Sequence, residues 1–399
     1  MKKGWQTKKL GEICEIERGG SPRPIQNFIT TDPKGINWIK IGDATASDKY
    51  IYKTEEKIKP EGVKRSRMVY EGDFILSNSM SFGRPYIMKT TGCIHDGWLV
   101  LHQPKVDPDY LYHVLSSDLV FSQFDRLAAG STVRNLNIGL AKSVEIPYPP
   151  LPEQQRIVGI LDEAFGGIAT ATANAEKNLQ NGRALFESFL QSVFAQHGPG
   201  WVETTLSQAT GGILTGPFGS LLHKSDYVAN GIPLVNPAHI TEIGIEPDLL
   251  KTVSKETALR LKSYIMREGD IVIGRRGEMG RCALVTEIED GWLCGTGSFF
   301  IKPSSRCDTR YLVRFLRSEG CKGRLEKIAG GAVMPNLSNT DLGNLDFDLP
   351  PLDRQKFIVQ EIDDLHEETQ RLETIYKQKL AALEELKKSL LHQAFTGAL

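Results

Sequence analysis

The chain has 399 residues, 40% hydrophobic and 24% charged, and its 48 Lys and Arg against 49 Asp and Glu leave a net charge of −1. This composition is typical of a soluble protein with two or three globular domains. No apolar run approaches the length of a transmembrane helix, which excludes an integral helical membrane protein. A net charge this close to zero gives no evidence for a nucleic-acid partner. Positive charge is only local: residues 49–67 hold seven basic and three acidic side chains.

The sequence shows no pattern typical of a signal peptide, a zinc site or a disulfide framework. The N-terminal segment MKKGWQTKKL is basic, but no apolar stretch follows it, so we expect no signal peptide. The six cysteines are scattered without a CxxC pair or a matching histidine spacing, which is typical of reduced thiols rather than of zinc sites or disulfides. We therefore expect a cytoplasmic protein.

Read in order, the first half predicts a mixed α/β domain. Gly4-Trp5 opens a polar segment that leads into a Gly/Pro-rich turn, GGSPRP. The sequence EGD at residues 71–73 predicts a tight turn before an apolar run of strand length, and Gly97-Trp98 heads a second such run, WLVLH. The pattern YLYHVLSS at residues 110–117 predicts a short helix.

A proline box, IPYPPLPEQQRIV at residues 146–158, follows this domain. Pro149 and Pro150 disfavour a helix before them. Pro152 suits the first helical turn, where its missing N–H costs nothing, and Glu153 lies favourably beside the helix N-terminus. The box therefore predicts the start of a long helix.

The second half repeats the first at an offset of about 200 residues, half of the chain. The matching features, in order, are Gly200-Trp201, the turn GPFGS at 216–220, EGD at 268–270, Gly291-Trp292 for Gly97-Trp98, YLVRFLRS at 311–318, Gly331 with Asn336-Leu337 for Gly130 with Asn135-Leu136, and a second proline box, LPPLDRQKFIV at 349–359.

Both segments after the proline boxes have apolar residues at alternating steps of three and four, the spacing of a coiled coil. The first seam is Leu161, Phe165, Ile168, Thr172, Ala175, Leu179, Gly182, Phe186, Phe189 and Val193. The second is Ile358, Ile362, Leu365, Thr369, Leu372, Tyr376, Lys379, Leu383, Leu386 and Leu390. Each helix alone could pack on its neighbouring globular domain, but two matched seams in one chain favour pairing with each other.

We therefore expect an α+β protein with a pseudo-two-fold internal repeat, in which two mixed α/β domains are separated by two long helices that form an antiparallel coiled coil. The expected bounds are 1–150 and 200–350 for the globular domains, and 151–199 and 351–399 for the helices. A helix of about 44 residues is roughly 65 Å long. Such a two-fold arrangement suits duplex DNA, with inverted half-sites about 34 Å apart.

Motifs for catalysis are missing. The sequence contains no GxxxxGK[ST] phosphate loop, HExxH, GxSxG or EF-hand loop, and no [DNS]PP[YFW] box with a glycine-rich cofactor loop. Asp162-Glu163-Ala164-Phe165 imitates a helicase box but lies on the coiled-coil seam. Asp270 is interpreted as a turn residue matching Asp73 rather than as a nuclease carboxylate, and we expect no metal site.

The remaining chemistry is that of binding. Arg275, Arg276 and Arg281 lie on a glycine-containing loop after a strand-like run, and arginine suits bidentate contact with guanine or phosphate. The matching loop, residues 77–84, offers Asn78 for adenine and hydroxyls for bases or phosphates. Solvated surface turns are the alternative interpretation of both loops. The full set of expected DNA-binding residues is Arg18, Arg23, Lys40, Arg65, Arg67, Asn78, Ser79, Arg84, Arg134, Lys224, Arg275, Arg276, Arg281 and Asn336.

The two proline boxes with their helices, the EGD turns, GINWIKIGD at 35–43, GPFGSLLHKSDYVANGIPLV at 216–235 and the ending LLHQAFTGAL resemble the specificity subunit of Type I restriction-modification enzymes. The resemblance covers essentially the whole chain. It implies two target-recognition domains, each of which reads one half of a split DNA target, and two helices that set the gap and dock two methyltransferase subunits. It further implies a nuclease/translocase subunit in the full complex.

By the same resemblance the chain is not itself an enzyme, and S-adenosylmethionine, ATP and magnesium belong to partner subunits. The coiled-coil residues expected to serve pairing and partner binding are Leu161, Phe165, Ile168, Leu179, Phe186, Phe189, Ile362, Leu365, Leu372, Leu383, Leu386 and Leu390. One departure is that the second box has PPLDRQ where the first has PPLPEQ, which would weaken the symmetry between two docking surfaces.

Two other functional classes remain open from the residues. A single-chain nuclease or methyltransferase would bind cofactor or act on DNA without partners. A coiled-coil scaffold without a DNA role would tolerate changes in its basic loops. The two predicted recognition domains are only loosely alike, so a specificity subunit of this sequence is expected to read two different half-sites.

Overall fold

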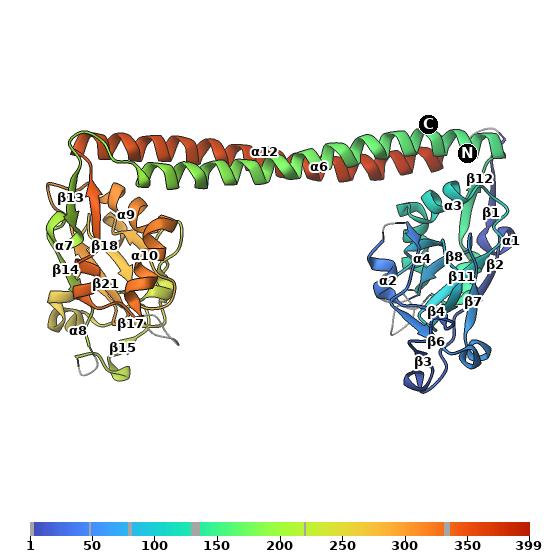
Figure 1. Ribbon diagram of the computed structural model, residues 1–399, viewed down its shortest axis with the longest axis horizontal. Helices are drawn as coiled ribbons and strands as arrows, with labels where there is room; N and C mark the ends of the chain where they lie inside the picture. The colour runs from blue at the N-terminus through green and yellow to red at the C-terminus, as the bar shows by residue number, and fades with distance from the viewer. Residues whose placement is uncertain (1–3, 48, 79–81, 129–135, 219–220, 331–335) are drawn as a thin grey trace. The chain divides into compact units, whose positions relative to one another are not determined.

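The computed structural model describes residues 4–47, 49–78, 82–128, 136–218, 221–330 and 336–399, and it divides the chain into two compact units. Unit 1 comprises residues 1–176 and 377–399, and unit 2 comprises residues 177–376. Each unit contains a globular α/β part and one part of each of two long helices, α6 (Leu151–Ala195) and α12 (Leu352–Thr396) (Figure 1).

Unit 1 contains two five-stranded sheets and a two-stranded one. The first sheet has the order β2 (Glu15–Arg18), β11 (Trp98–His102), β8 (Phe74–Ser77), β9 (Pro85–Met88) and β5 (Tyr50–Ile51). The second has the order β3 (Ile29–Thr30), β6 (Glu56–Ile58), β4 (Ile36–Ile39), β10 (Gly92–Ile94) and β7 (Arg67–Val69). The third pairs β1 (Gln6–Lys9) with β12 (Glu145–Tyr148).

Five short helices accompany these sheets in the described part of unit 1. They are α1 (Leu10–Ile13), α2 (Ile41–Thr45), α3 (Pro108–Leu115), α4 (Asp118–Ala128) and α5 (Ile138–Ser143), with short 3₁₀ turns η1 (Ile25–Asn27) and η2 (Pro60–Arg65). The core includes Phe74, Tyr110 and Phe124, all fully buried, together with Leu391 and Phe395 of α12. The C-terminal end of the chain is therefore part of the core of unit 1.

Unit 2 repeats this plan with shorter sheets. Its main sheet has the order β14 (Gly212–Thr215), β21 (Ser298–Lys302), β18 (Ile271–Gly274) and β19 (Cys282–Leu284). Three strand pairs accompany it: β13 (Val202–Thr205) with β22 (Asp346–Leu349), β15 (Tyr227–Val228) with β17 (Thr252–Val253), and β16 (Leu234–Val235) with β20 (Leu293–Cys294).

The helices of unit 2 are α7 (Leu206–Ala209), α8 (Lys255–Arg260), α9 (Thr309–Arg317), α10 (Glu319–Ala329) and α11 (Asn339–Gly343). Within its described residues the 3₁₀ turns are η4 (Lys224–Asp226), η5 (Pro237–His239), η6 (Lys262–Tyr264) and η7 (Glu287–Glu289). The predicted short helices at 110–117 and 311–318 correspond to α3 and α9.

Strand register corrects one of the predicted matches between the halves. Trp98 lies opposite Ser77 of β8, and Ser298 lies opposite Gly274 of β18. The structural counterpart of Gly97-Trp98 is therefore Gly297-Ser298, and not Gly291-Trp292, which instead leads into β20. The shared Gly-Trp dipeptide misled the comparison, because backbone pairing, and not the tryptophan, defines equivalence between the two units.

The two EGD sequences form the predicted turns. The carboxylate of Asp73 accepts a hydrogen bond from the backbone N–H of Tyr70, and Asp270 does the same for Arg267, both at 2.8 Å. Both aspartates are nearly buried and each has a basic partner, His102 Nδ1 at 2.8 Å from Asp73 and Lys302 Nζ at 2.6 Å from Asp270. Asp270 is thus a structural turn residue.

The proline boxes are held by a buried glutamine in each half. Gln154 donates to Pro149 O at 2.8 Å and accepts from the backbone N–H of Asp107, the N-cap of α3, at 2.8 Å. Gln355 donates to Pro350 O at 2.7 Å and accepts from the N–H of Asp308, the N-cap of α9, at 2.7 Å. Each glutamine therefore ties the start of a long helix to a globular domain.

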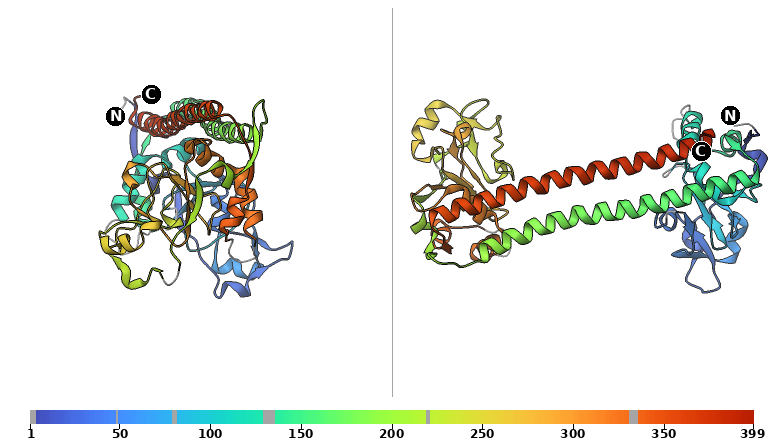
Figure 2. Two further views of the ribbon diagram at one scale, coloured as in Figure 1. Left: turned by 90° about the vertical axis from the view of Figure 1, so that its left-hand side faces the viewer. Right: turned by 90° about the horizontal axis from the view of Figure 1, so that it is seen from above.

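Within each unit the two long helices run antiparallel and side by side (Figure 2). In unit 1, Arg156 near the start of α6 donates to the carbonyl of Leu399 at 3.0 Å. In unit 2, Arg183 forms a bidentate pair with Glu373 at 2.7 and 3.1 Å, and the rings of Phe186 and His366 are 5.1 Å apart. The predicted antiparallel coiled coil is confirmed.

The predicted seam is correct for α6 but partly wrong for α12. Lys379 is exposed and Leu380 lies inward in its place, while Leu372 and Leu386 are 37% and 47% exposed. Of the two heptad series in α12, the one through Leu372 and Leu386 therefore leaves the interface after its first members, while the other series stays within it. The other predicted seam residues of the site set are buried or half-buried: Leu161, Phe165, Ile168, Leu179, Phe186, Phe189, Ile362, Leu365, Leu383 and Leu390.

These features confirm the predicted α+β fold class with an internal repeat. Among the residues described, no helix has both the length and the apolar character needed to cross a membrane.

Candidate nucleic-acid interface

The loop that follows β18 in unit 2 is fixed by backbone hydrogen bonds to two distant segments. The N–H of Arg275 donates to Gly297 O at 3.0 Å, and its carbonyl accepts from the N–H of Leu337 at 2.9 Å. Arg276 forms an antiparallel β-bridge with Asn336. Because both neighbours are anchored by the fold, the two arginines have defined backbone positions.

The Arg275 side chain is half-buried between two aromatic rings. Its guanidinium carbon lies 5.5 Å from the ring centre of Phe218 and 5.4 Å from that of Phe299. Phe299 is fully buried in the main sheet, whereas Phe218 is 51% exposed. Burial, and then the neighbouring charge of Arg276, lower the pKa of Arg275 from its usual value.

Asn336 brings the two arginines together. Its Oδ1 atom accepts from Arg275 Nε at 3.2 Å and from Arg276 Nε at 3.4 Å. Two adjacent arginines and an asparagine about 60 positions later, all predicted from the sequence, therefore form one cluster. Sequence reasoning missed Phe218, although an exposed aromatic residue inside a glycine-rich turn was a usable signal.

Arg281, the third arginine of this loop, is placed differently. It forms an ion pair with Glu278 three residues earlier, which lowers the pKa of that carboxyl group through the hydrogen bond between them. Its backbone carbonyl accepts from the N–H of Gly274. The guanidinium of Arg281 is thus engaged within the loop and does not join the cluster.

In unit 1, Asn78 has the same backbone hydrogen bonds as Arg275 in unit 2, but its side chain is buried. Asn78 donates its N–H to Gly97 O and accepts from Leu136 N–H, both at 3.0 Å. Its side-chain amide donates to Asp96 O at 2.8 Å, and the residue is only 2% exposed. In this structure the Asn78 side chain is therefore buried and its amide nitrogen is engaged by Asp96, so its contact with adenine stays a prediction.

The exposed polar cluster of unit 1 lies instead around Asp96. Its carboxylate accepts from Ser21 Oγ at 2.5 Å and pairs with Arg23 at 3.3 Å, while Arg18 Nε donates to its backbone carbonyl at 3.2 Å. The hydrogen bond from Ser21 is the main cause that lowers the pKa of Asp96. Two predicted residues, Arg18 and Arg23, converge here; Ser21 and Asp96 were not predicted.

Glycine is required beside each cluster by close backbone approach. A Cβ atom on Gly19 would lie 2.0 Å from His95 O, and one on Gly216 would lie 1.8 Å from Gly295 O. The two Gly-rich turns predicted from the sequence therefore pack closely against the segments that contain Asp96 and Gly297. This close packing positions Arg23 beside Asp96 and Phe218 beside Arg275.

The remaining predicted residues do not form a single cluster. Lys40 pairs with Glu56 at 2.7 Å, a hydrogen bond that raises the lysine pKa, and Arg67 pairs with Glu17 at 3.2 Å. The other three with described positions are all exposed: Arg65, Arg84 and Lys224. Ser79 and Arg134 lie outside the described residues.

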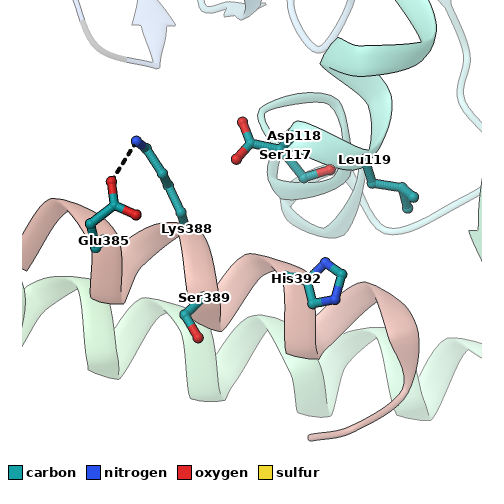
Figure 3. Close-up of a pocket in the computed structure, with 7 residues that line it drawn as sticks. All are labelled: Ser117, Asp118, Leu119, Glu385, Lys388, Ser389 and His392. Atoms are coloured by element: carbon teal, nitrogen blue, oxygen red, sulfur yellow. Dashed lines mark hydrogen bonds and ion pairs between the residues drawn. The ribbon is translucent and has the colours of Figure 1, made fainter.

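Among the cavities lined by described residues of unit 1, two lie where the globular part meets the long helices. The smaller, about 290 Å³, is lined by Ser117, Asp118 and Leu119 on one side and by four residues of α12 on the other (Figure 3). The larger, about 860 Å³, includes Arg84, Tyr112 and Phe165. Within the described parts of the chain, no group of three or more His, Cys, Asp or Glu side chains is placed to hold a metal ion.

Comparison with known proteins points to one family. The family model for the Type I restriction modification DNA specificity domain matches residues 2–179 and 219–384. The specificity subunit of the Type I restriction enzyme StySPI from Salmonella potsdam is 23% identical over 100% of this chain and 90% of that protein. The MjaVIII specificity subunit from Methanocaldococcus jannaschii is 22% identical over 98% of this chain and 92% of that protein.

Solved structures share the fold. The HsdS subunit from Thermoanaerobacter tengcongensis is similar over 100% of this chain and 98% of its own, with a TM-score of 0.69 and 21% identity. A chain from a structure that describes complex assembly and conformational transition of the type I R-M system has a TM-score of 0.76 and 20% identity, and covers 100% of this chain and 99% of its own.

Proposed function

The chain belongs to the family of Type I restriction-modification DNA specificity proteins, and on this premise we propose that its two globular domains each read one half of a bipartite DNA target. The domain in residues 1–150 reads one half and the domain in residues 200–350 reads the other. The paired helices α6 and α12 set the gap between the halves and dock the partner subunits.

The observation that carries this proposal is a shared framework with different side chains at matching positions. Asn78 and Arg275 occupy equivalent backbone sites, each held by a glycine carbonyl and by a leucine N–H. One side chain is buried and the other takes part in an exposed, positively charged cluster. A common framework with unlike chemistry suits two related domains that bind the same kind of ligand but read different sequences.

The proposed partners are double-stranded DNA, two methyltransferase subunits and, in the complete enzyme, nuclease/translocase subunits. In this proposal the chain supplies recognition and is not itself catalytic. S-adenosylmethionine, ATP and magnesium then belong to the partners. A direct check is binding of radiolabelled S-adenosylmethionine, which we expect for the assembled complex with methyltransferase subunits and not for the purified chain alone.

The test of the proposed function is methylome sequencing of cells that express this chain with a cognate methyltransferase subunit. Cells that express the methyltransferase subunit alone are the control. We expect a new methylated motif made of two short, unlike halves with a fixed gap. The same motif in the control, or a stable complex that methylates no such motif, would contradict the proposal.

A further inference from the structure

We propose that Arg275 and Arg276 read guanine in the major groove, in the half of the target bound by residues 200–350, and that Asn336 holds both guanidinium groups in the orientation for reading. The ring of Phe218 packs against the guanidinium group of Arg275 and helps to hold it in place. This inference rests on the proposed function, and it assigns a base identity to a defined pair of side chains.

The hydrogen bonds determine which edge of each arginine faces outward. Asn336 Oδ1 takes the Nε–H of both side chains, at 3.2 and 3.4 Å. The two Nη groups of each guanidinium then form its remaining donor edge. Two parallel N–H donors match the O6 and N7 acceptors of guanine, which is the commonest specific arginine contact with DNA.

Packing holds the Arg275 side chain in one orientation before DNA binds, so binding costs less conformational entropy. Its guanidinium carbon lies 5.5 Å from the ring centre of Phe218 and 5.4 Å from that of Phe299, distances at which a cation and a ring attract each other. Its backbone is held by Gly297 and Leu337. A planar fork fixed before binding has less conformational entropy to lose, which favours specific contact.

The charge balance also indicates a ligand rich in acceptors. Among the residues that the structure describes, no carboxylate forms an ion pair with Arg275 or Arg276. Other arginines of the same unit are paired: Arg260 with Asp226, Arg267 with Asp290 and Arg281 with Glu278. Two adjacent positive charges without an acidic partner repel each other, and bound base acceptors would relieve that repulsion.

Unit 1 lacks the equivalent pair. Its matching residue is the buried Asn78, and its exposed cluster includes the carboxylate of Asp96. The effect of changing the two arginines should therefore be confined to one half of the target.

The experiment is methylome sequencing with the complex of this chain and its methyltransferase subunit, comparing the unaltered chain with Arg275→Lys and Arg276→Lys. Lysine keeps the positive charge and a phosphate contact but cannot make the planar bidentate contact. Arg267→Lys, in the same unit but paired with Asp290 and outside the predicted DNA-binding set, is the matched control. Methylation of sites with the first half intact shows that each variant folds and assembles.

For each of the two variants we expect loss of discrimination at one G·C position in a single half of the motif, by about ten- to one-hundredfold. The other half and the gap should be unchanged, as should the motif with Arg267→Lys. An unchanged motif in both variants would overturn the assignment. Uniformly weaker methylation that is corrected by lower salt, with no base position relaxed, would also overturn it, since it would identify phosphate contacts. Absence of any bipartite motif with the unaltered chain would instead refute the proposed function, and the assignment with it.

Discussion

Gln154 and Gln355 fix the junctions between domains and helices at the scale of single side chains. Gln154 is 2% exposed and Gln355 is fully buried, and each bonds both a proline-box carbonyl and the backbone of an N-cap aspartate. The glutamine in the PPLxxQ pattern is therefore a structural residue. Its role follows from the amide, which can donate and accept at once.

We expect Gln355→Leu to reduce the free energy of unfolding by about 3 kcal/mol, because it leaves buried polar groups of Pro350 and Asp308 without partners. Denaturation with guanidinium chloride measures the change. Gln360→Leu on the same helix, where the amide is exposed, is the control and should change stability by less than about 0.5 kcal/mol. Equal effects of the two substitutions would contradict a junction role for Gln355.

The two units differ in the basic residue that joins the globular domain to a long helix, which is histidine in unit 1 and arginine in unit 2. His113 of α3 places Nε2 at 3.0 Å from Asp162 of α6, whereas the matching pair in unit 2 is Arg314 with Asp363 at 2.7 Å. Burial lowers the pKa of His113, and the bond to Asp162 opposes that change only in part. Arginine stays protonated at all accessible pH values.

Acidification should therefore destabilise unit 1. The pKa of His113 in the folded state lies below its unfolded value of about 6.5, so the unfolded chain binds the proton more readily. Stability is then lost as pH falls from about 6.5 toward the folded pKa. We expect His113→Gln to reduce this loss in denaturation curves measured at pH 7.5 and pH 5.5; an identical pH dependence in both proteins would refute it.

The long helices show how far a heptad pattern can be followed at the scale of an element. The α12 seam retains Ile362, Thr369 and Tyr376, but the series through Leu372 and Leu386 turns outward. Leu380 enters the interface instead of Lys379. The heptad spacing of α12 therefore predicts one apolar series along the helix, and the other series only near the start of the helix.

We expect Ile362→Ala to destabilise the chain by about 2–4 kcal/mol, because the side chain is fully buried in the core of unit 2. Leu386→Ala should cost less than about 0.5 kcal/mol in the isolated chain, because that side chain is 47% exposed. Thermal unfolding of the two variants compares them directly. A large loss with Leu386→Ala would restore the strict heptad interpretation.

At the scale of the whole molecule, the two units differ in how the chain builds them. Unit 2 is one continuous segment, residues 177–376, with its own core. Unit 1 needs both ends of the chain, since Leu391, Ala394 and Phe395 of α12 belong to the same core as Tyr110.

A fragment of residues 177–376 should therefore fold alone, while removal of residues 377–399 should unfold unit 1 and leave unit 2 folded. We expect a cooperative thermal transition from the fragment in circular dichroism. In the truncated chain, limited proteolysis should cut residues 4–150 and spare residues 200–350. Resistance of both regions to protease would show that the end of α12 is dispensable for unit 1.

The sequence alone determined the repeat, the two long helices and the α+β class, because these depend on local patterns: prolines before a helix, apolar spacing along it, and turns before strands. It also predicted Arg275, Arg276 and Asn336 as DNA-binding residues, which the structure brings into one cluster. Comparing the loops at 77–84 and 275–281 in the sequence did not reveal that Asn78 is buried while the arginine side chains reach the surface.

Only the tertiary structure decided which of those side chains come together and which are buried. Asn336 meets the two arginines because segments about 60 residues apart pair through the backbone. Asn78 is turned inward by a bond to Asp96, a residue brought close by the pairing of β8 with β11. Contacts between distant segments depend on register and packing of the complete domain, and no local pattern in the sequence specifies them.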